Sequence, residues 1–180
     1  MNIIISRSED QTWFRPDTTL ETENKDIYPH DDISGYDFLP VVFARVSKAG
    51  KCVAEEFAMR YYDALNFGLL LFPKGLSDSQ NVDIAPIENR VDHTTLLPHP
   101  MYNKIVFDSE NDNKFIMKRD GKTLFKCTTK GKNLCKEIES AISRITRLSS
   151  IRTGDFVCVP LAEEKASLWR REKDCTDVPV

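Results

Sequence analysis

Apolar residues occur along the chain in short runs that are separated by Gly, Pro, Asn and Asp. Because these separating residues favour turns, each run rich in β-branched or aromatic side chains predicts a buried strand. The predicted strands cover residues 3–5, 41–46, 69–72, 104–107 and 156–161. Residues 115–118 and 123–126 flank an Asp120-Gly121 pair, which predicts a β-hairpin because Gly tolerates the positive φ of a tight turn.

Two other stretches repeat apolar residues every three or four positions, which places these residues on one face of a helix. The first predicts a helix over residues 53–67 that ends at Gly68, and its apolar face consists of Ala54, Phe57, Ala58, Tyr61 and Leu65. The second predicts a helix over residues 132–148, and its apolar face consists of Leu134, Ile138, Ala141, Ile142, Ile145 and Leu148.

The remaining stretches are polar and rich in proline or charge. Residues 7–36 predict a loop with one short strand, and residues 74–103 predict a long loop in which Thr95–Leu97 is a candidate strand. Residues 163–180 are strongly charged and could form a terminal helix or a frayed end. We therefore expect one domain over residues 1–162, followed by a charged tail over residues 163–180.

The composition fits a single globular domain. The 180 residues are 41% hydrophobic and 29% charged, a balance that argues against wholesale disorder. No apolar run approaches the roughly 20 residues that span a bilayer, and the first residues lack the features of a signal peptide. The five cysteines contain no CxxC pair, which favours reduced thiols over a disulfide framework or a zinc site. We therefore expect a cytoplasmic protein with no membrane partner.

Charge is distributed unevenly along the chain. Residues 1–100 hold 9 Lys and Arg against 16 Asp and Glu, whereas residues 101–180 hold 16 against 12. The basic residues of the second half are interleaved with acids, and no aromatic stacking platform lies among them. We therefore expect no nucleic-acid partner.

Three stretches of the sequence resemble segments of one known family. Residues 14–20, Phe-Arg-Pro-Asp-Thr-Thr-Leu, are similar to its "xKPxTxL" segment, and residues 41–68 are similar to a strand, a "GK" turn and a helix. Asp120-Gly121 and the later Gly154-Asp155 are similar to its "DG" and "GD" pairs. The chain thus resembles the fumarylacetoacetate hydrolase family. The resemblance implies an α+β, β-rich fold with a mixed rolled β-sheet and two principal helices, and often a dimer.

The resemblance also implies a metal site, from which this sequence departs. Family members hold Mg²⁺ or Mn²⁺ through two glutamates of an ExE pair and one aspartate, and the ion polarises a 2-oxo acid substrate. Here Asp37 takes the place of the first glutamate, but Leu39 takes the place of the second and Leu70 that of the aspartate. The family's active-site lysine is replaced by Asn89, although Asp92 of its "KxxD" motif is retained. We therefore expect no cofactor, or Mg²⁺ or Mn²⁺ if the site survives.

Two functional hypotheses follow from these departures. The first is a non-catalytic member of the family that acts as a binding or dimerisation module. It would hold a small anionic ligand near Arg15, Arg90 and Asp92, or pair with a second copy or a related protein, and it requires Leu39 and Leu70 to pack where the ion would sit.

The alternative is a divergent metal-dependent hydrolase, decarboxylase or isomerase that acts on 2-oxo acids such as acylpyruvates. It would use Asp37, Asp92 and either His93 or His99, and it requires these side chains to converge on one point.

Overall fold

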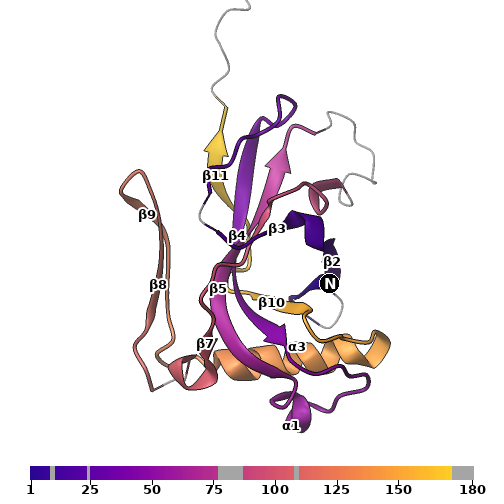
Figure 1. Ribbon diagram of the computed structural model, residues 1–180. Helices are drawn as coiled ribbons and strands as arrows, with labels where there is room; N and C mark the ends of the chain where they lie inside the picture. The colour runs from indigo at the N-terminus through magenta and orange to yellow at the C-terminus, as the bar shows by residue number, and fades with distance from the viewer. Residues whose placement is uncertain (9–10, 24, 77–86, 108–109, 172–180) are drawn as a thin grey trace, which may run out of the picture.

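The computed structural model describes residues 1–8, 11–23, 25–76, 87–107 and 110–171. Within these residues, nine strands form one mixed sheet that curls around its long central strands (Figure 1). These strands are β1 (Asn2–Ser6), β2 (Thr12–Pro16), β3 (Leu20–Glu21), β4 (Gly35–Val46), β5 (Tyr62–Lys74), β6 (Thr95–Leu96), β7 (Tyr102–Asn103), β10 (Phe156–Pro160) and β11 (Ala166–Arg170). A separate two-stranded sheet consists of β8 (Lys114–Arg119) and β9 (Lys122–Thr128).

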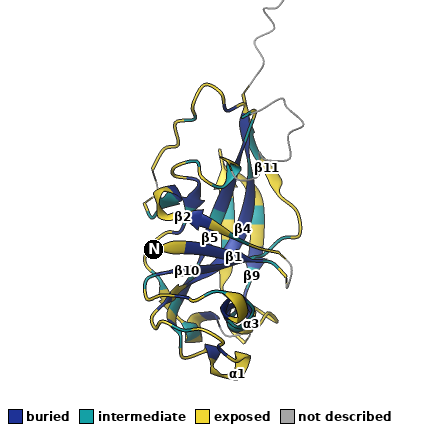
Figure 2. Ribbon diagram, turned by 90° about the vertical axis from the view of Figure 1, so that its right-hand side faces the viewer, coloured by how far each residue is buried: buried dark blue, intermediate teal, exposed yellow. Residues whose placement is uncertain are grey.

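The sheet mixes parallel and antiparallel pairs. Its strand order is β2-β1-β10-β4-β5-β6-β3, with β7 paired to β5 and β11 paired to β4. The pairs β1–β10 and β3–β6 are parallel, and the other pairs are antiparallel. The buried strands β1, β4 and β10 lie at the centre, surrounded by exposed loops (Figure 2). This arrangement confirms the predicted α+β class with a mixed, rolled β-sheet.

The β4–β5 ladder organises the core. It runs from the pair Gly35–Lys74 to the pair Val46–Tyr62, so side chains along each strand alternate between two faces of the sheet. One face carries an apolar cluster that contains Leu39, Leu70 and Phe72 together with residues of β1 and β10. The opposite face carries two clusters, one under the long helix and one beside the β8–β9 hairpin.

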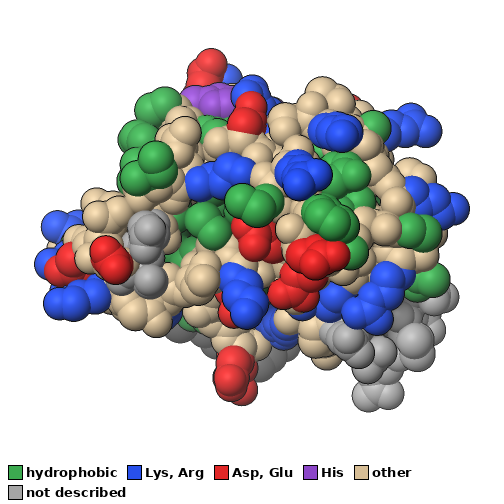
Figure 3. All heavy atoms as spheres, turned by 90° about the horizontal axis from the view of Figure 1, so that it is seen from below, with side chains coloured by type: hydrophobic (Ala, Val, Ile, Leu, Met, Phe, Trp, Pro, Cys, Tyr) green, Lys and Arg blue, Asp and Glu red, His purple; other side chains and the backbone are tan. Residues whose placement is uncertain are grey.

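The predicted helix over residues 132–148 is confirmed as α3 (Leu134–Leu148). The Asn133 side chain caps its start, accepting a hydrogen bond from the backbone N–H of Lys136 at 3.0 Å. Its apolar face is buried as expected, except for Leu148, which lies at the end of the helix and is 90% exposed. Seen from below, the surface over this end of the molecule mixes both signs of charge (Figure 3).

The predicted helix over residues 53–67 is wrong. Only α1 (Glu55–Ala58) is helical, and the chain enters β5 at Tyr62. Gly68 does not end a helix but lies inside β5, where a Cβ atom would stand 2.6 Å from the Leu96 carbonyl oxygen and 2.8 Å from a methyl group of Leu97. The long pairing with β4 outweighs the local helical periodicity of this segment.

Other predictions have mixed outcomes. The strands over 3–5, 41–46, 69–72 and 156–161 are confirmed within β1, β4, β5 and β10, and the hairpin is confirmed as β8–β9. Asp120 and Gly121 both adopt positive φ at the hairpin turn, as the sequence predicts. The strand over 104–107 is wrong, because Lys104–Phe107 forms a 3₁₀ turn, η2, that buries only Phe107.

Strands and 3₁₀ turns also occur in segments for which the sequence predicted a loop or no definite structure. The predicted loops contain β2, β3, the 3₁₀ turn η1 (Asp17–Thr19) and β6. Strand β11 pairs with the first half of β4, so the first part of the segment 163–180 belongs to the sheet. Residues 172–180 of that segment and residues 77–86 of the long loop lie outside the described residues. Among the described residues, no helix has both the length and the apolar character to cross a membrane.

Candidate functional site

The β4–β5 ladder brings together the three positions at which the family resemblance expects metal ligands. Leu39 and Leu70 are directly paired in the ladder, and both are fully buried in the apolar cluster of that face. Asp37 lies two residues before Leu39 on the same face, opposite Phe72. Two of the three expected ligands are therefore hydrocarbon side chains with no oxygen to offer a hard cation.

The third position, Asp37, is already neutralised by two cations. Its carboxylate accepts hydrogen bonds from Lys74 Nζ at 2.9 Å and Arg170 Nη2 at 2.6 Å, and its side chain is only 13% exposed. Burial by itself raises the pKa of Asp37, but the bonds from Lys74 and Arg170 outweigh burial and lower the pKa below its ordinary value. The Asp37 side chain is therefore ionised near neutral pH and held in place by its ion pairs with Lys74 and Arg170.

These residues do not fit a Mg²⁺ or Mn²⁺ ion. One carboxylate held by two cations provides little negative potential, and the remaining wall is apolar. Across the part of the chain that the structure describes, no three His, Cys, Asp or Glu side chains are grouped so that they could hold a metal ion.

Arg15 of β2 is a fully buried cation that connects separate strands. Its exposed fraction is 1%, and its guanidinium donates to the backbone carbonyls of Leu71 and Thr94, each at 2.9 Å. It also donates to Thr95 Oγ1 at 3.1 Å and to Asn89 Oδ1 at 3.2 Å. Burial lowers the pKa of Arg15 to about 10. Asn89, at the position where the family resemblance expects a lysine, therefore helps to hold a buried arginine.

Arg15 shares the ring of Phe72 with a second cation that the sequence did not indicate. The Arg15 guanidinium carbon lies 4.6 Å from the ring centroid, and Lys165 Nζ lies 3.6 Å from it. Lys165 also pairs with Glu88 at 3.4 Å. Burial, followed by the nearby charges of Lys74 and Arg15, lowers the pKa of Lys165 despite the opposing effect of Glu88.

Arg15 and Lys165 lie over the Phe72 ring, Lys165 pairs with Glu88, and Lys74 and Arg170 bind Asp37, the ladder partner of Phe72. We call these six charged residues, together with Phe72, the Phe72 cation cluster. Four cations face two carboxylates, so the cluster carries a surplus of two positive charges in a partly buried position. Sequence reasoning missed Lys165 because it lies in the segment assigned to the charged tail, and only the return of the chain into β11 brings it to Phe72.

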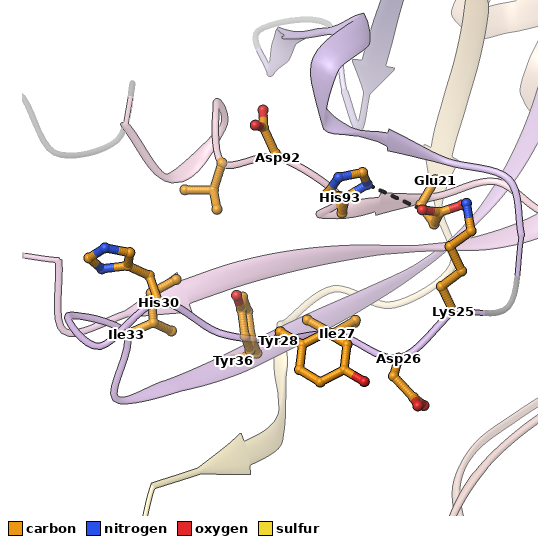
Figure 4. A pocket seen from close by; sticks show the side chains of 11 residues that line it. Glu21, Lys25, Asp26, Ile27, Tyr28, His30, Ile33, Tyr36, Asp92 and His93 are labelled. Atoms are coloured by element: carbon orange, nitrogen blue, oxygen red, sulfur yellow. Dashed lines mark hydrogen bonds and ion pairs between the residues drawn. The ribbon is translucent and has the colours of Figure 1, made fainter.

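Asp92 and His93 lie in a different place, a pocket of about 790 Å³ between the 25–33 segment and the 91–93 segment (Figure 4). His93 Nδ1 lies 3.2 Å from Glu21 Oε2 at one end of the pocket. Tyr36 of β4 lines the pocket, and Asp37 therefore projects to the opposite face of the strand. We call this the Tyr36 pocket; it is lined by Glu21, Lys25, Asp26, Ile27, Tyr28, His30, Ile33, Tyr36, Val91, Asp92 and His93.

The structure therefore separates the residues that the sequence grouped. Arg15 is buried on one side of the sheet, Asp92 lines the Tyr36 pocket, and Arg90 is exposed on the turn between them. Asp92 and His93 share the Tyr36 pocket, whereas Asp37 belongs to the Phe72 cation cluster. His99 is exposed and lines neither site.

Comparisons with known proteins give matches in structure only. No family model and no curated protein matches the sequence. A 5-carboxymethyl-2-hydroxymuconate delta-isomerase from Mycobacterium smegmatis superposes with a TM-score of 0.70 at 14% identity, covering 93% of this chain and 70% of that chain. A fumarylpyruvate hydrolase from Pseudomonas aeruginosa, solved with Mn²⁺ and pyruvate, gives a TM-score of 0.65 at 14% identity, covering 89% and 70%.

A third structure agrees with these two. Fumarylacetoacetate hydrolase from Exiguobacterium antarcticum gives a TM-score of 0.67 at 11% identity, covering 88% of this chain and 61% of that chain. The three proteins share the family to which the sequence is similar, and the similarity extends over most of the present chain. The chain therefore has the fold of the fumarylacetoacetate hydrolase family.

Proposed function

We propose that this protein is a non-catalytic representative of the fold and that it binds a small anion without a metal ion. The pairing of Leu39 with Leu70 carries the proposal. In the apolar cluster these leucines occupy two positions where the family resemblance expects carboxylates. The family's chemistry requires an ion that polarises the 2-oxo group, and an apolar wall cannot hold such an ion.

The loss of the carboxylates also changes the electrostatics of the site. Carboxylates that converge on an empty metal site repel each other, and apolar replacements of buried charges are often neutral or stabilising. Here the remaining carboxylate, Asp37, is bound by Lys74 and Arg170. The electrostatic preference of this side of the sheet is therefore reversed, from attracting a cation to attracting an anion.

The Phe72 cation cluster supports an anion as the ligand. Arg15 is buried and makes no ion pair within the described residues, so its charge adds to the local potential without being exposed itself. Lys165 remains 37% exposed and points its amine onto the same ring, so it can contact a ligand directly. We therefore assign the contact with the anion to Lys165, with Arg15 in support, rather than to the exposed Arg90. The ligand class is a small carboxylate, such as a 2-oxo acid.

Isothermal titration calorimetry with pyruvate, in the presence of EDTA, tests this proposal. The wild-type protein should bind pyruvate without metal, and Lys165→Gln should weaken binding by at least about tenfold, which corresponds to about 1.4 kcal/mol. Lys51→Gln, which removes the same charge from an exposed position, should leave binding unchanged. Absence of metal-free binding, equal binding by both variants, or turnover of acylpyruvates on addition of Mn²⁺ would overturn the proposal.

A further inference from the structure

The Tyr36 pocket contains a hydroxyl group for which the described chain supplies no partner. Tyr36 is only 5% exposed, because its ring packs in one apolar cluster with Phe38 and Leu71. Its hydroxyl forms no hydrogen bond among the described residues, and burial alone raises the pKa of the phenol. Figure 4 shows this hydroxyl pointing into the pocket, toward the side on which Asp92 lies. Because buried polar groups are normally hydrogen-bonded, a phenol held in this way indicates a ligand that bonds to it.

Two carboxylates of the pocket also lack a partner. Asp26 and Asp92 are exposed, and neither makes an ion pair within the part of the chain that the structure describes. Apart from the histidines, the charged lining consists of these two aspartates, Glu21 and Lys25, so the acids exceed the base by two charges. The pocket therefore attracts positive charge.

The basic side chains of the pocket do not satisfy these two aspartates, because each of them lies against another acid. The three pairs are Lys25 with Glu23 at 3.0 Å, His30 with Asp32 at 3.1 Å and His93 with Glu21 at 3.2 Å. Asp26 and Asp92 are thus left for a ligand.

A single inorganic cation does not fit this arrangement. Figure 4 shows Asp26 and Asp92 at opposite sides of the pocket, with Ile27 and Tyr36 between them. Among the described residues, no three His, Cys, Asp or Glu side chains are grouped so that they could hold one ion. The complementary ligand has two separate positive charges joined by an apolar segment.

We propose that the Tyr36 pocket binds a linear aliphatic diamine or polyamine. One ammonium group pairs with Asp92 and donates a hydrogen bond to the Tyr36 hydroxyl, and the other pairs with Asp26. The methylene chain lies on Ile27 and the neighbouring apolar wall, where it buries hydrocarbon that one ion would leave exposed. Tyr28, which also lines the pocket, adds an aromatic face of the kind that attracts ammonium groups. The pocket volume of about 790 Å³ is within the usual range for small-molecule sites.

This site is separate from the Phe72 cation cluster. Tyr36 and Asp37 are neighbours in β4, so their side chains project to opposite faces of the sheet. The two sites prefer ligands of opposite charge, and the diamine site does not rest on the proposed anion binding.

Isothermal titration calorimetry of the full chain with hexamethylenediamine and spermidine tests the proposal. The wild-type protein should bind both, and hexylamine, which has the same chain as hexamethylenediamine but one ammonium group, should bind at least about threefold more weakly. Asp26→Asn and Asp92→Asn should each weaken binding of the diamine at least about threefold and remove its advantage over hexylamine. Tyr36→Phe should weaken binding about threefold without lowering stability, because the hydroxyl has no partner within the described chain.

Two controls separate this site from other surfaces. Asp63→Asn removes the same charge from a side chain that lies outside the pocket and is 53% exposed, and it should leave diamine binding unchanged. Lys165→Gln, which weakens the proposed anion site, should also leave it unchanged.

Several results would overturn the proposal. These are absence of diamine binding, equal affinity for hexylamine and the diamine, or wild-type affinity in both aspartate variants. Displacement of the diamine by an equal concentration of Ca²⁺ would assign the aspartates to an inorganic ion instead. Binding of a lysine-rich peptide without binding of either amine would assign the pocket to a protein partner. If an aspartate variant fails to fold, the comparison of hexylamine with the diamine on the wild-type protein still decides the question.

Discussion

Leu39 of β4 and Leu70 of β5 are direct partners in the longest strand pair of the sheet, and neither side chain is exposed. They occupy two of the three positions where the family resemblance expects oxygen ligands. The pair therefore links the fold to the functional proposal, because the side chains that complete the core stand where the proposal requires the metal ligands to be absent.

If Leu70 is a core residue, truncating it should destabilise the protein. Leu70→Ala should reduce the free energy of unfolding by about 2–5 kcal/mol, the usual cost of a cavity in a packed interior. Leu148→Ala is the matched control, because Leu148 is 90% exposed, and it should change stability by no more than about 0.5 kcal/mol. Urea denaturation measures both changes. Equal stability of the two variants would show that the leucine pair is not packed as described.

Replacing the buried Arg15 should destabilise the protein much more than replacing the exposed Arg90. Arg15→Met leaves the carbonyls of Leu71 and Thr94 without their buried donor, so we expect a loss of about 2–4 kcal/mol. Arg90→Met changes an exposed side chain and should have little effect on denaturation by urea. A large loss with Arg90→Met, and none with Arg15→Met, would reverse the structural roles assigned to the two arginines.

The ion pairs of Asp37 predict a specific dependence of stability on pH. Because the pKa of Asp37 is lower in the folded protein than in the unfolded chain, its contribution is present above the unfolded value, about pH 4. It is lost as the pH falls below that value through the folded pKa. Asp37→Asn should therefore be less stable than wild type at pH 7 and should lose less stability between pH 5 and pH 3.

The control for this pH dependence is Asp63→Asn. Asp63 is 53% exposed, and its nearest cation, Arg45, lies at 3.6 Å. Thermal denaturation across the pH range should give the same acid-induced loss for Asp63→Asn and wild type. An unchanged acid dependence in Asp37→Asn would show that its ion pairs do not stabilise the fold.

The cysteines should react selectively with alkylating reagents. Burial raises the pKa of Cys158 to about 12, despite the nearby positive charge of Arg15, whereas Cys52 is exposed. Iodoacetamide at pH 8 should label Cys52 in the native protein and Cys158 only after unfolding, because a buried thiol is protonated and inaccessible. Peptide mass mapping measures the labelling. Rapid native labelling of Cys158 would contradict its position in the core.

The sequence predicted those elements whose local pattern agrees with their tertiary contacts. Helix α3 has both a continuous apolar stripe and a capping Asn133, and the β8–β9 hairpin has the Asp-Gly turn that its positive φ angles require. The pairing of Leu39 with Leu70 brings together two positions at which the family resemblance expects ligands, and whether they correspond to a metal site stays a prediction.

Where local and tertiary preferences disagree, the sequence prediction was wrong. The apolar residues of the stretch 53–67 repeat as they would in a helix, yet pairing with β4 makes residues 62–67 part of a strand. Gly68 is needed for the close approach of β6 rather than for a helix end. Lys165 could not be placed at Phe72 from sequence, because its position depends on β11 pairing with a strand about 130 residues away.

The most direct test of the central claim is the thermal midpoint of the protein with millimolar Mn²⁺ or Mg²⁺, with and without oxaloacetate. A functioning site at 100 times its dissociation constant would stabilise the fold by about 2.7 kcal/mol, and at this size the midpoint would rise by about 5–10 °C. Because Leu39 and Leu70 replace two expected ligands and Asp37 is held by Lys74 and Arg170, we predict no rise with either metal and the same response to oxaloacetate with and without it. A metal-dependent rise that increases with the oxo acid would contradict the account and identify the protein as a metal-dependent enzyme.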